Sequence, residues 1–130
     1  MQTILVVEDD MNLREIISYN LDLQGREVLE CANGPDALAL LSEKGRQVDL
    51  VILDLGLPTM DGFQVARRIK SDPILKSIPI LLCTGKPPSK IIEGMHVGAD
   101  DFISKPFSIE RDLLVRIDVL LNKQAILQGA

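Results

Sequence analysis

Four short apolar segments of this chain are each followed at once by side chains that carry a charge or a hydroxyl group. The side chains in these positions are Glu8, Asp9, Asp10, Asp54, Thr84 and Lys105. Carboxylates held close together repel one another, and a divalent cation with oxygen ligands, such as Mg²⁺, relieves that repulsion. A lysine can pair with a phosphoryl oxygen, and a threonine hydroxyl can donate to another oxygen. These residue types are the ones needed to transfer a phosphoryl group onto a carboxylate.

Most of these residues also have a purely structural explanation. The acids at 8–10 could mark the start of a helix, where negative charge is favourable. Thr84 could cap a helix or a turn, and Lys105 could be an ordinary surface lysine. Asp54 differs, because an acid that ends an apolar segment is costly without a partner. The occurrence of all of them after successive apolar segments favours a functional site.

Five apolar segments predict the strands that would position these side chains. They cover residues 4–7, 28–32, 50–53, 78–83 and 101–104. Several are continuously apolar, which is typical of strands buried on both faces of a parallel sheet. The alternation with helices predicts an α/β fold with a doubly wound five-stranded parallel sheet and five helices. Such sheets bind ligands beyond the carboxyl ends of their strands, where the polar residues lie.

Helical patterns fill the intervals between these strands. The first is capped by Asp10 and stopped by Gly25, and the second runs from Pro35 to Gly45. A third pattern covers residues 63–69. The fourth helix is expected to begin at Ser89 as its cap, with Gly98 as its stop, and the last helix covers residues 113–121.

Composition restricts the class of protein. The 130 residues suit a single domain spanning 1–130, and 46% of them are hydrophobic, enough for a core. A net charge of −5 argues against direct binding of nucleic acid or of an anionic membrane by this domain. Cys31 and Cys83 lie among apolar residues and are expected to be buried, reduced thiols. With no signal peptide and no membrane-spanning segment, the expected location is the cytoplasm.

Four motifs occur in the order and spacing of a known family. They are ILVVEDD at 4–10, LDLGLP with MDGF at 53–58 and 60–63, TG at 84–85, and GADDFISKPF at 98–107. With these motifs the chain resembles the response-regulator receiver domains of two-component signalling, over essentially its whole length. The resemblance implies the flavodoxin-like strand order 2-1-3-4-5. It also implies a signalling switch that takes a phosphoryl group, and not an enzyme acting on external substrates.

The resemblance assigns a role to each residue of the acidic group. Asp54 would accept the phosphoryl group. Mg²⁺, or Mn²⁺ in its place, would be held by Glu8, Asp9, Asp54 and the backbone carbonyl of Gly56. Asp10 is not expected to touch the metal.

The other polar residues would respond to the phosphoryl group. Lys105 would pair with a phosphoryl oxygen and with Asp54, and the peptide bond before Pro106 would be cis. Thr84 and Phe102 match the family's switch pair: the hydroxyl would move toward the phosphate and the ring would turn into the vacated space.

The resemblance also implies partners. The phosphoryl group would come from a phosphohistidine of a sensor histidine kinase or of a histidine phosphotransfer protein. The recipient of the signal would be an output domain or a target protein. The chain could be a stand-alone regulator or a receiver cut from a longer one. Asp100, Asp101 and Arg116 resemble charges used for phosphorylation-dependent homodimers through the fourth helix, fifth strand and fifth helix. His96 is expected to be a solvent-facing bystander.

Several features depart from the family or suit another class. The segment after Phe107 is about one residue longer than in the most similar transcription-factor receivers, and Pro87 and Pro88 would stiffen the loop after Thr84. One alternative is a haloacid-dehalogenase-like phosphatase, but those enzymes need a second aspartate where this chain has Gly56. The other alternative is a receiver-like interaction module that is never phosphorylated.

Overall fold

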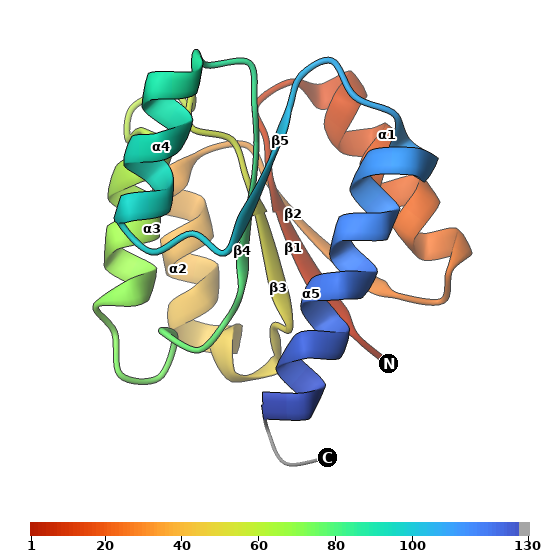
Figure 1. The fold of residues 1–130 in the computed structure, drawn as a ribbon. Helices are drawn as coiled ribbons and strands as arrows, with labels where there is room; N and C mark the ends of the chain where they lie inside the picture. The colour runs from red at the N-terminus through yellow and green to blue at the C-terminus, as the bar shows by residue number, and fades with distance from the viewer. Residues whose placement is uncertain (128–130) are drawn as a thin grey trace.

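A single parallel sheet organises the molecule (Figure 1). The computed structural model describes residues 1–127. The strands lie in the order β2-β1-β3-β4-β5. They are β1 (Thr3–Val7), β2 (Glu27–Cys31), β3 (Leu50–Leu53), β4 (Ile80–Thr84) and β5 (Asp101–Ser104). The predicted doubly wound parallel sheet and its strand order are confirmed.

Helices cover both faces of this sheet. They are α1 (Met11–Leu23), α2 (Gly34–Lys44), α3 (Gly62–Lys70), α4 (Pro88–His96) and α5 (Leu114–Leu127), with a short 3₁₀ turn, η1 (Gly45–Gln47), after α2. Figure 1 shows α1 and α5 on one face and α2, α3 and α4 on the other. None of the helices in residues 1–127 is long and apolar enough to cross a membrane.

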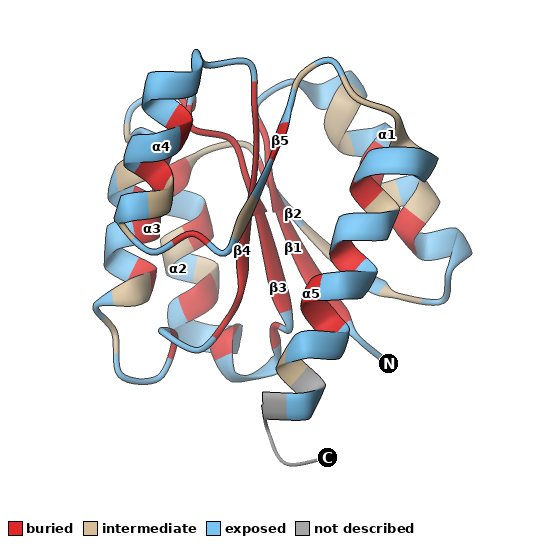
Figure 2. Ribbon diagram, viewed as in Figure 1, coloured by how far each residue is buried: buried red, intermediate tan, exposed pale blue. Residues whose placement is uncertain are grey.

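The core lies in two layers, one on each side of the sheet. Alternate residues of β1 point to opposite layers: Leu5 packs with the α2–α3 side and Ile4 with the α1–α5 side. All residues of β1, β3 and β4 are buried, as the red strands of Figure 2 show. Burial on both faces explains why these three strands are continuously apolar in sequence.

Most helix starts follow from local side-chain chemistry. Asp10 caps α1 by accepting a hydrogen bond from the Leu13 amide at 3.2 Å, as predicted, and Asp61 caps α3 in the same way. Gly25 follows the end of α1 with φ +77°, a conformation that favours glycine. The prediction that Ser89 caps α4 is wrong. Helix α4 begins at Pro88, where proline has its backbone torsion preset and no amide hydrogen to satisfy.

The last helix begins with a wider turn than expected. Residues Ile109–Leu113 form a π-helical turn, and Ser108 caps it through the Arg111 amide at 3.1 Å. A π turn holds one more residue than an α turn. Leu113 at the end of this turn and Ile117 one turn later are both buried in the core.

The two cysteines are free and buried, as predicted. Burial raises the pKa of the Cys83 thiol to about 12, so this thiol stays protonated at neutral pH. Cys31 lies at the end of β2, and burial raises its pKa as well.

Candidate functional site

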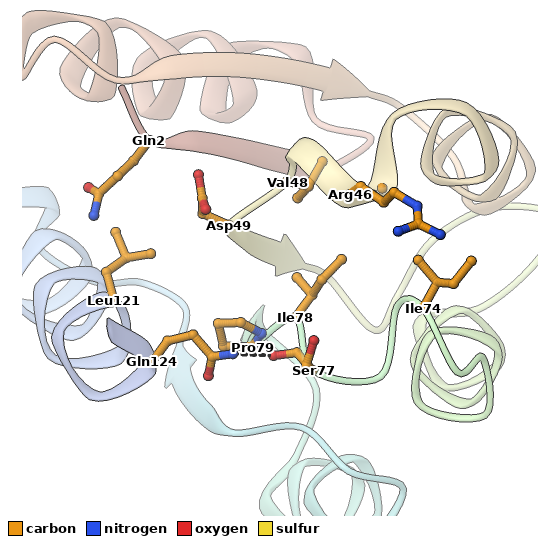
Figure 3. A pocket seen from close by; sticks show the side chains of 11 residues that line it. Gln2, Arg46, Val48, Asp49, Ile74, Ser77, Ile78, Pro79, Leu121 and Gln124 are labelled. Atoms are coloured by element: carbon orange, nitrogen blue, oxygen red, sulfur yellow. Dashed lines mark hydrogen bonds between the residues drawn. The ribbon is translucent and has the colours of Figure 1, made fainter. Parts of the chain in front are cut away.

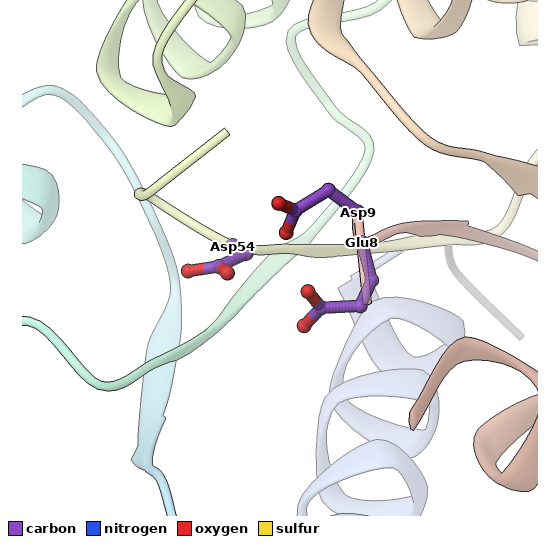
Figure 4. Close-up of side chains that lie close together, drawn as sticks. All are labelled: Glu8, Asp9 and Asp54. Carbon is purple, nitrogen blue, oxygen red and sulfur yellow. The ribbon is translucent and has the colours of Figure 1, made fainter. Parts of the chain in front are cut away.

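The acidic residues meet because of the strand register. Val7 is paired with Leu53, so Glu8 and Asp54 are the next residues of two neighbouring strands. The carboxylates of Glu8, Asp9 and Asp54 gather at this edge (Figure 4), with one oxygen of each within 4.8 Å of the others. Glu8 is 2% exposed and Asp54 7%. Three carboxylates at such distances offer the oxygen donors that Mg²⁺ prefers.

Lys105 joins this group from the carboxyl end of the outermost strand, β5. It follows β5 directly, and its Nζ donates to Glu8 Oε1 at 2.6 Å and to Asp54 Oδ2 at 3.0 Å. The peptide bond between Lys105 and Pro106 is cis, as the resemblance implies. The ammonium group therefore links two carboxylates that would otherwise repel each other.

The loop after β3 holds the Asp54 side chain through a backbone amide. The Gly56 amide donates to Asp54 Oδ1 at 3.1 Å. Gly62 brings the start of α3 against the same loop, because a Cβ atom there would lie 2.3 Å from the Asp54 carbonyl oxygen. Its amide donates to the Leu55 carbonyl at 3.0 Å. Asp54 is thus fixed between a strand end and a helix start.

The surroundings of the carboxylates set their pKa values in opposite directions. Burial raises the pKa of Asp54, but hydrogen bonds from the Gly56 amide, Lys105 and Thr84 outweigh it, so the pKa lies below its usual value. Burial dominates at Glu8, whose pKa is raised despite its bond to Lys105. Burial alone would lower the pKa of Lys105, but both carboxylates hold it above its usual value. At neutral pH Asp54 is an ionised carboxylate beside a charged ammonium group.

Thr84 and Phe102 lie on the neighbouring strands β4 and β5. Thr84 is the last residue of β4, buried, and its Oγ1 accepts a hydrogen bond from the Lys86 amide at 3.2 Å. Phe102 is 39% exposed. Its ring lines an apolar groove of about 550 Å³ together with Ile91, Ile92, Met95 and His96 of α4. The ring therefore occupies the outward position in this structure.

Comparison with known proteins identifies the family. A family model described as the response regulator receiver domain matches residues 4–118. The chain belongs to this family. Receiver domains are regulatory phosphoacceptor domains of two-component response regulators, and they bind Mg²⁺ at an acidic pocket.

Its relatives include longer transcriptional regulators. The phosphate regulon transcriptional regulatory protein PhoB of Pseudomonas aeruginosa is 41% identical over 94% of this chain and 52% of its own. The DNA-binding dual master transcriptional regulator RpaA of Synechocystis is 38% identical over 95% of this chain and 50% of its own. This receiver domain thus spans about half the length of these relatives. A receiver domain structure from Clostridium thermocellum matches with TM-score 0.88 and 27% identity, covering 98% and 99% of the two chains.

Other residues singled out in the receiver sequence lie outside the acidic group. His96 is exposed at the end of α4. Asp101 pairs with Arg116 of the same chain at 2.7 Å. Asp100 pairs with Lys70 at 3.2 Å and accepts from the Ile80 amide. In this structure these charges therefore make contacts within one chain.

One residue near the receiver site was not predicted. The Arg14 side chain donates to the Glu8 carbonyl at 2.8 Å and to Glu30 of β2 at 3.1 Å. In sequence Arg14 is an ordinary helix residue. No local pattern marks it, because Glu30 is 16 positions away.

A separate pocket lies at the opposite edge of the sheet (Figure 3). Its volume is about 290 Å³, and Gln2, Arg46, Asp49 and Gln124 are among its lining residues. Gln124 donates to the Ser77 carbonyl at 2.8 Å and closes one side. The pocket borders the starts of β1 and β3, so it is remote from the carboxylates at the strand ends.

We expect Lys105→Met to raise the pKa of Asp54, because burial stays while the Lys105 donor and charge are lost. In the unchanged domain, the stability that ionised Asp54 contributes is present above the pKa of an unfolded aspartate. It is lost as the pH falls through the lower folded pKa. Carboxyl ¹³C NMR titration would measure the midpoint, with Lys90→Met on α4 as the control. An unchanged Asp54 midpoint in Lys105→Met would contradict this account.

Proposed function

We propose that this receiver domain takes a phosphoryl group onto Asp54 and thereby changes its binding surface. The donor is a phosphohistidine of a sensor histidine kinase or of a histidine phosphotransfer protein. The observation that carries the proposal is the convergence of Asp54, Lys105 and two further acids at one edge of the sheet. Family membership supports it, since receiver domains are phosphoacceptors.

The chemistry follows from the state of Asp54. An ionised carboxylate oxygen attacks the phosphorus atom, and an oxygen–phosphorus bond forms as the phosphorus–nitrogen bond of the phosphohistidine breaks. The imidazole nitrogen leaves with the bonding electron pair. Lys105, 3.0 Å from Asp54 Oδ2, is placed to pair with a phosphoryl oxygen.

The acidic residues are suited to a divalent cation. Glu8, Asp9, Asp54 and the backbone carbonyl of Gly56 would hold Mg²⁺, with Mn²⁺ as a substitute. When bound, the ion supplies positive charge against the phosphoryl oxygens. Lys105 supplies one positive charge to the two carboxylates of Glu8 and Asp54. Negative charge therefore remains in the acidic group for a cation to balance.

The added phosphate would act through Thr84 and Phe102. We expect the Thr84 hydroxyl to move toward the phosphoryl group and the Phe102 ring to turn inward. The groove beside α4 would change shape, because Phe102 forms part of its lining. An output domain or a target protein would read this change.

Two further assignments belong to this proposal. Residues 1–130 form a single receiver domain, either as a stand-alone regulator or as part of a longer one like the relatives, and residues 128–130 lie outside those the structure describes. Phosphorylation favours a homodimer through α4, β5 and α5, where Ile92, Val115 and Val119 are exposed. The domain is not expected to bind DNA by itself.

Intact mass measured after incubation with acetyl phosphate tests the proposal. We expect a gain of one phosphoryl group with Mg²⁺ and none when the metal is chelated by EDTA. Absence of the adduct under conditions that trap a short-lived phosphate would favour the interaction module. If each protein chain instead hydrolysed many molecules of a phosphate ester and released inorganic phosphate, the phosphatase alternative would be favoured.

A further inference from the structure

Arg14 connects three elements beside the acidic group. It belongs to the second turn of α1, and its side chain is only 16% exposed. Nη1 donates to the Glu8 carbonyl at 2.8 Å, and Nε donates to Glu30 Oε1 on β2 at 3.1 Å. One guanidinium group thus ties the end of β1 to α1 and to the edge strand β2.

These contacts fix the peptide plane that follows Glu8. The Glu8 amide donates to the Cys31 carbonyl at 3.0 Å, so the residue is held from its amide side by β2. The Glu8 carbonyl takes no part in the backbone hydrogen bonds of α1. The first of those bonds runs from the Arg14 amide to the Asp10 carbonyl. Among the described residues, the hydrogen bond to the Glu8 carbonyl comes from the Arg14 side chain. A planar peptide with its oxygen fixed has a fixed orientation.

The orientation of this peptide helps to set the direction of the Asp9 Cα–Cβ bond. Asp9 is exposed, and no hydrogen bond within residues 1–127 holds its carboxylate. Its position relative to Glu8 and Asp54 therefore depends on the backbone. Glu8 has a second constraint, since Lys105 holds its carboxylate at 2.6 Å.

From this geometry we infer that Arg14 is a positioning residue for the divalent cation. It acts through the Glu8–Asp9 peptide and keeps the Asp9 carboxylate directed toward Glu8 and Asp54. The inference rests on the proposed function, because it presumes that these carboxylates bind a divalent cation. Groups that orient metal ligands in this way commonly change metal affinity by 10- to 100-fold when removed.

The charge of Arg14 does not oppose this role. A bare cation beside a metal site would weaken binding of another cation. Glu30 pairs with Arg14 on the side away from the Glu8 carbonyl and neutralises it. The guanidinium group can therefore act as a rigid double donor at little electrostatic cost to the metal.

Arg26 provides a matched control. Its side chain is 13% exposed and pairs with Asp118 at 2.7 Å, so it resembles Arg14 in burial and in having one acidic partner. It lies just before β2, at the end of the strand opposite to the acidic group. Arg14→Ala and Arg26→Ala each remove a largely buried arginine from an ion pair, but only the first touches the backbone of Glu8.

Isothermal titration of the isolated domain with Mg²⁺ tests the inference. We expect Arg14→Ala to raise the apparent Kd for Mg²⁺ by about tenfold, and Arg26→Ala to leave it within about twofold. Half-maximal phosphorylation by acetyl phosphate should need about tenfold more Mg²⁺ in Arg14→Ala, while the rate at saturating Mg²⁺ stays close to that of the unchanged chain. Arg14→Lys, which keeps one donor, should lie between the two.

Three outcomes would overturn the inference. Equal Mg²⁺ affinity in both alanine variants would leave Arg14 with a role in stability alone. If Arg14→Ala does not fold, Arg14→Lys takes its place, and an unchanged Kd in that folded variant would count against the inference. An unchanged domain that binds no Mg²⁺ would refute the proposed metal site itself, a result distinct from a defect confined to Arg14 variants.

Discussion

Asp54→Asn is expected to abolish the Mg²⁺-dependent gain of a phosphoryl group from acetyl phosphate. The asparagine side chain has no anionic oxygen to attack phosphorus, and an amide cannot form the acyl phosphate. Its Oδ1 can still accept from the Gly56 amide, so the loop after β3 should keep its shape. Intact mass over a time course would measure the loss, which we expect to be complete.

The exposed Asp22 on α1 supplies the control for this experiment. Asp22→Asn makes the same chemical change on the outer surface and should leave phosphorylation unchanged. Circular dichroism would verify that both variants fold. Phosphorylation of Asp54→Asn at the rate of the unchanged chain would mean that another side chain accepts the group.

Gly62→Ala should be among the most destabilising single methyl additions in this domain. The new Cβ would lie 2.3 Å from the Asp54 carbonyl oxygen and 2.6 Å from Leu55 Cα. Both atoms belong to the backbone, so neither can turn away as a flexible side chain would. The start of α3 must separate from the loop that carries Asp54, at a cost of about 3 kcal/mol.

Urea unfolding followed by far-ultraviolet circular dichroism would measure the cost of Gly62→Ala. Gly85→Ala is the matched control, because its Cβ would meet only Lys105 Cβ at 3.9 Å, an ordinary contact. We expect that variant to stay within about 1 kcal/mol of the unchanged chain. A free energy of unfolding for Gly62→Ala equal to that of Gly85→Ala would show that α3 does not pack against the loop as described.

Much of the fold could be predicted from local patterns. Continuous apolar segments predicted β1, β3 and β4. These strands are buried on both faces of the sheet, and such strands need apolar residues at consecutive positions. Helix ends were predicted correctly where a single residue controls the backbone, as with Asp10 and Gly25. The prediction of Ser89 as a cap was wrong because it assumed that a side-chain hydroxyl group starts the helix. Helix α4 begins at Pro88 with no side-chain cap.

The sequence by itself determined which residues meet at the acidic edge. Parallel strands end at one edge of a sheet, so Glu8, Asp54 and Lys105 had to converge once the strands were recognised. Only the tertiary structure decided how they are held. The hydrogen bond from Lys105 to Glu8 joins residues that are 97 positions apart in the sequence, and the hydrogen bond from Arg14 to Glu30 joins residues 16 positions apart. Such contacts depend on strand register and helix packing, which no local pattern of residues encodes.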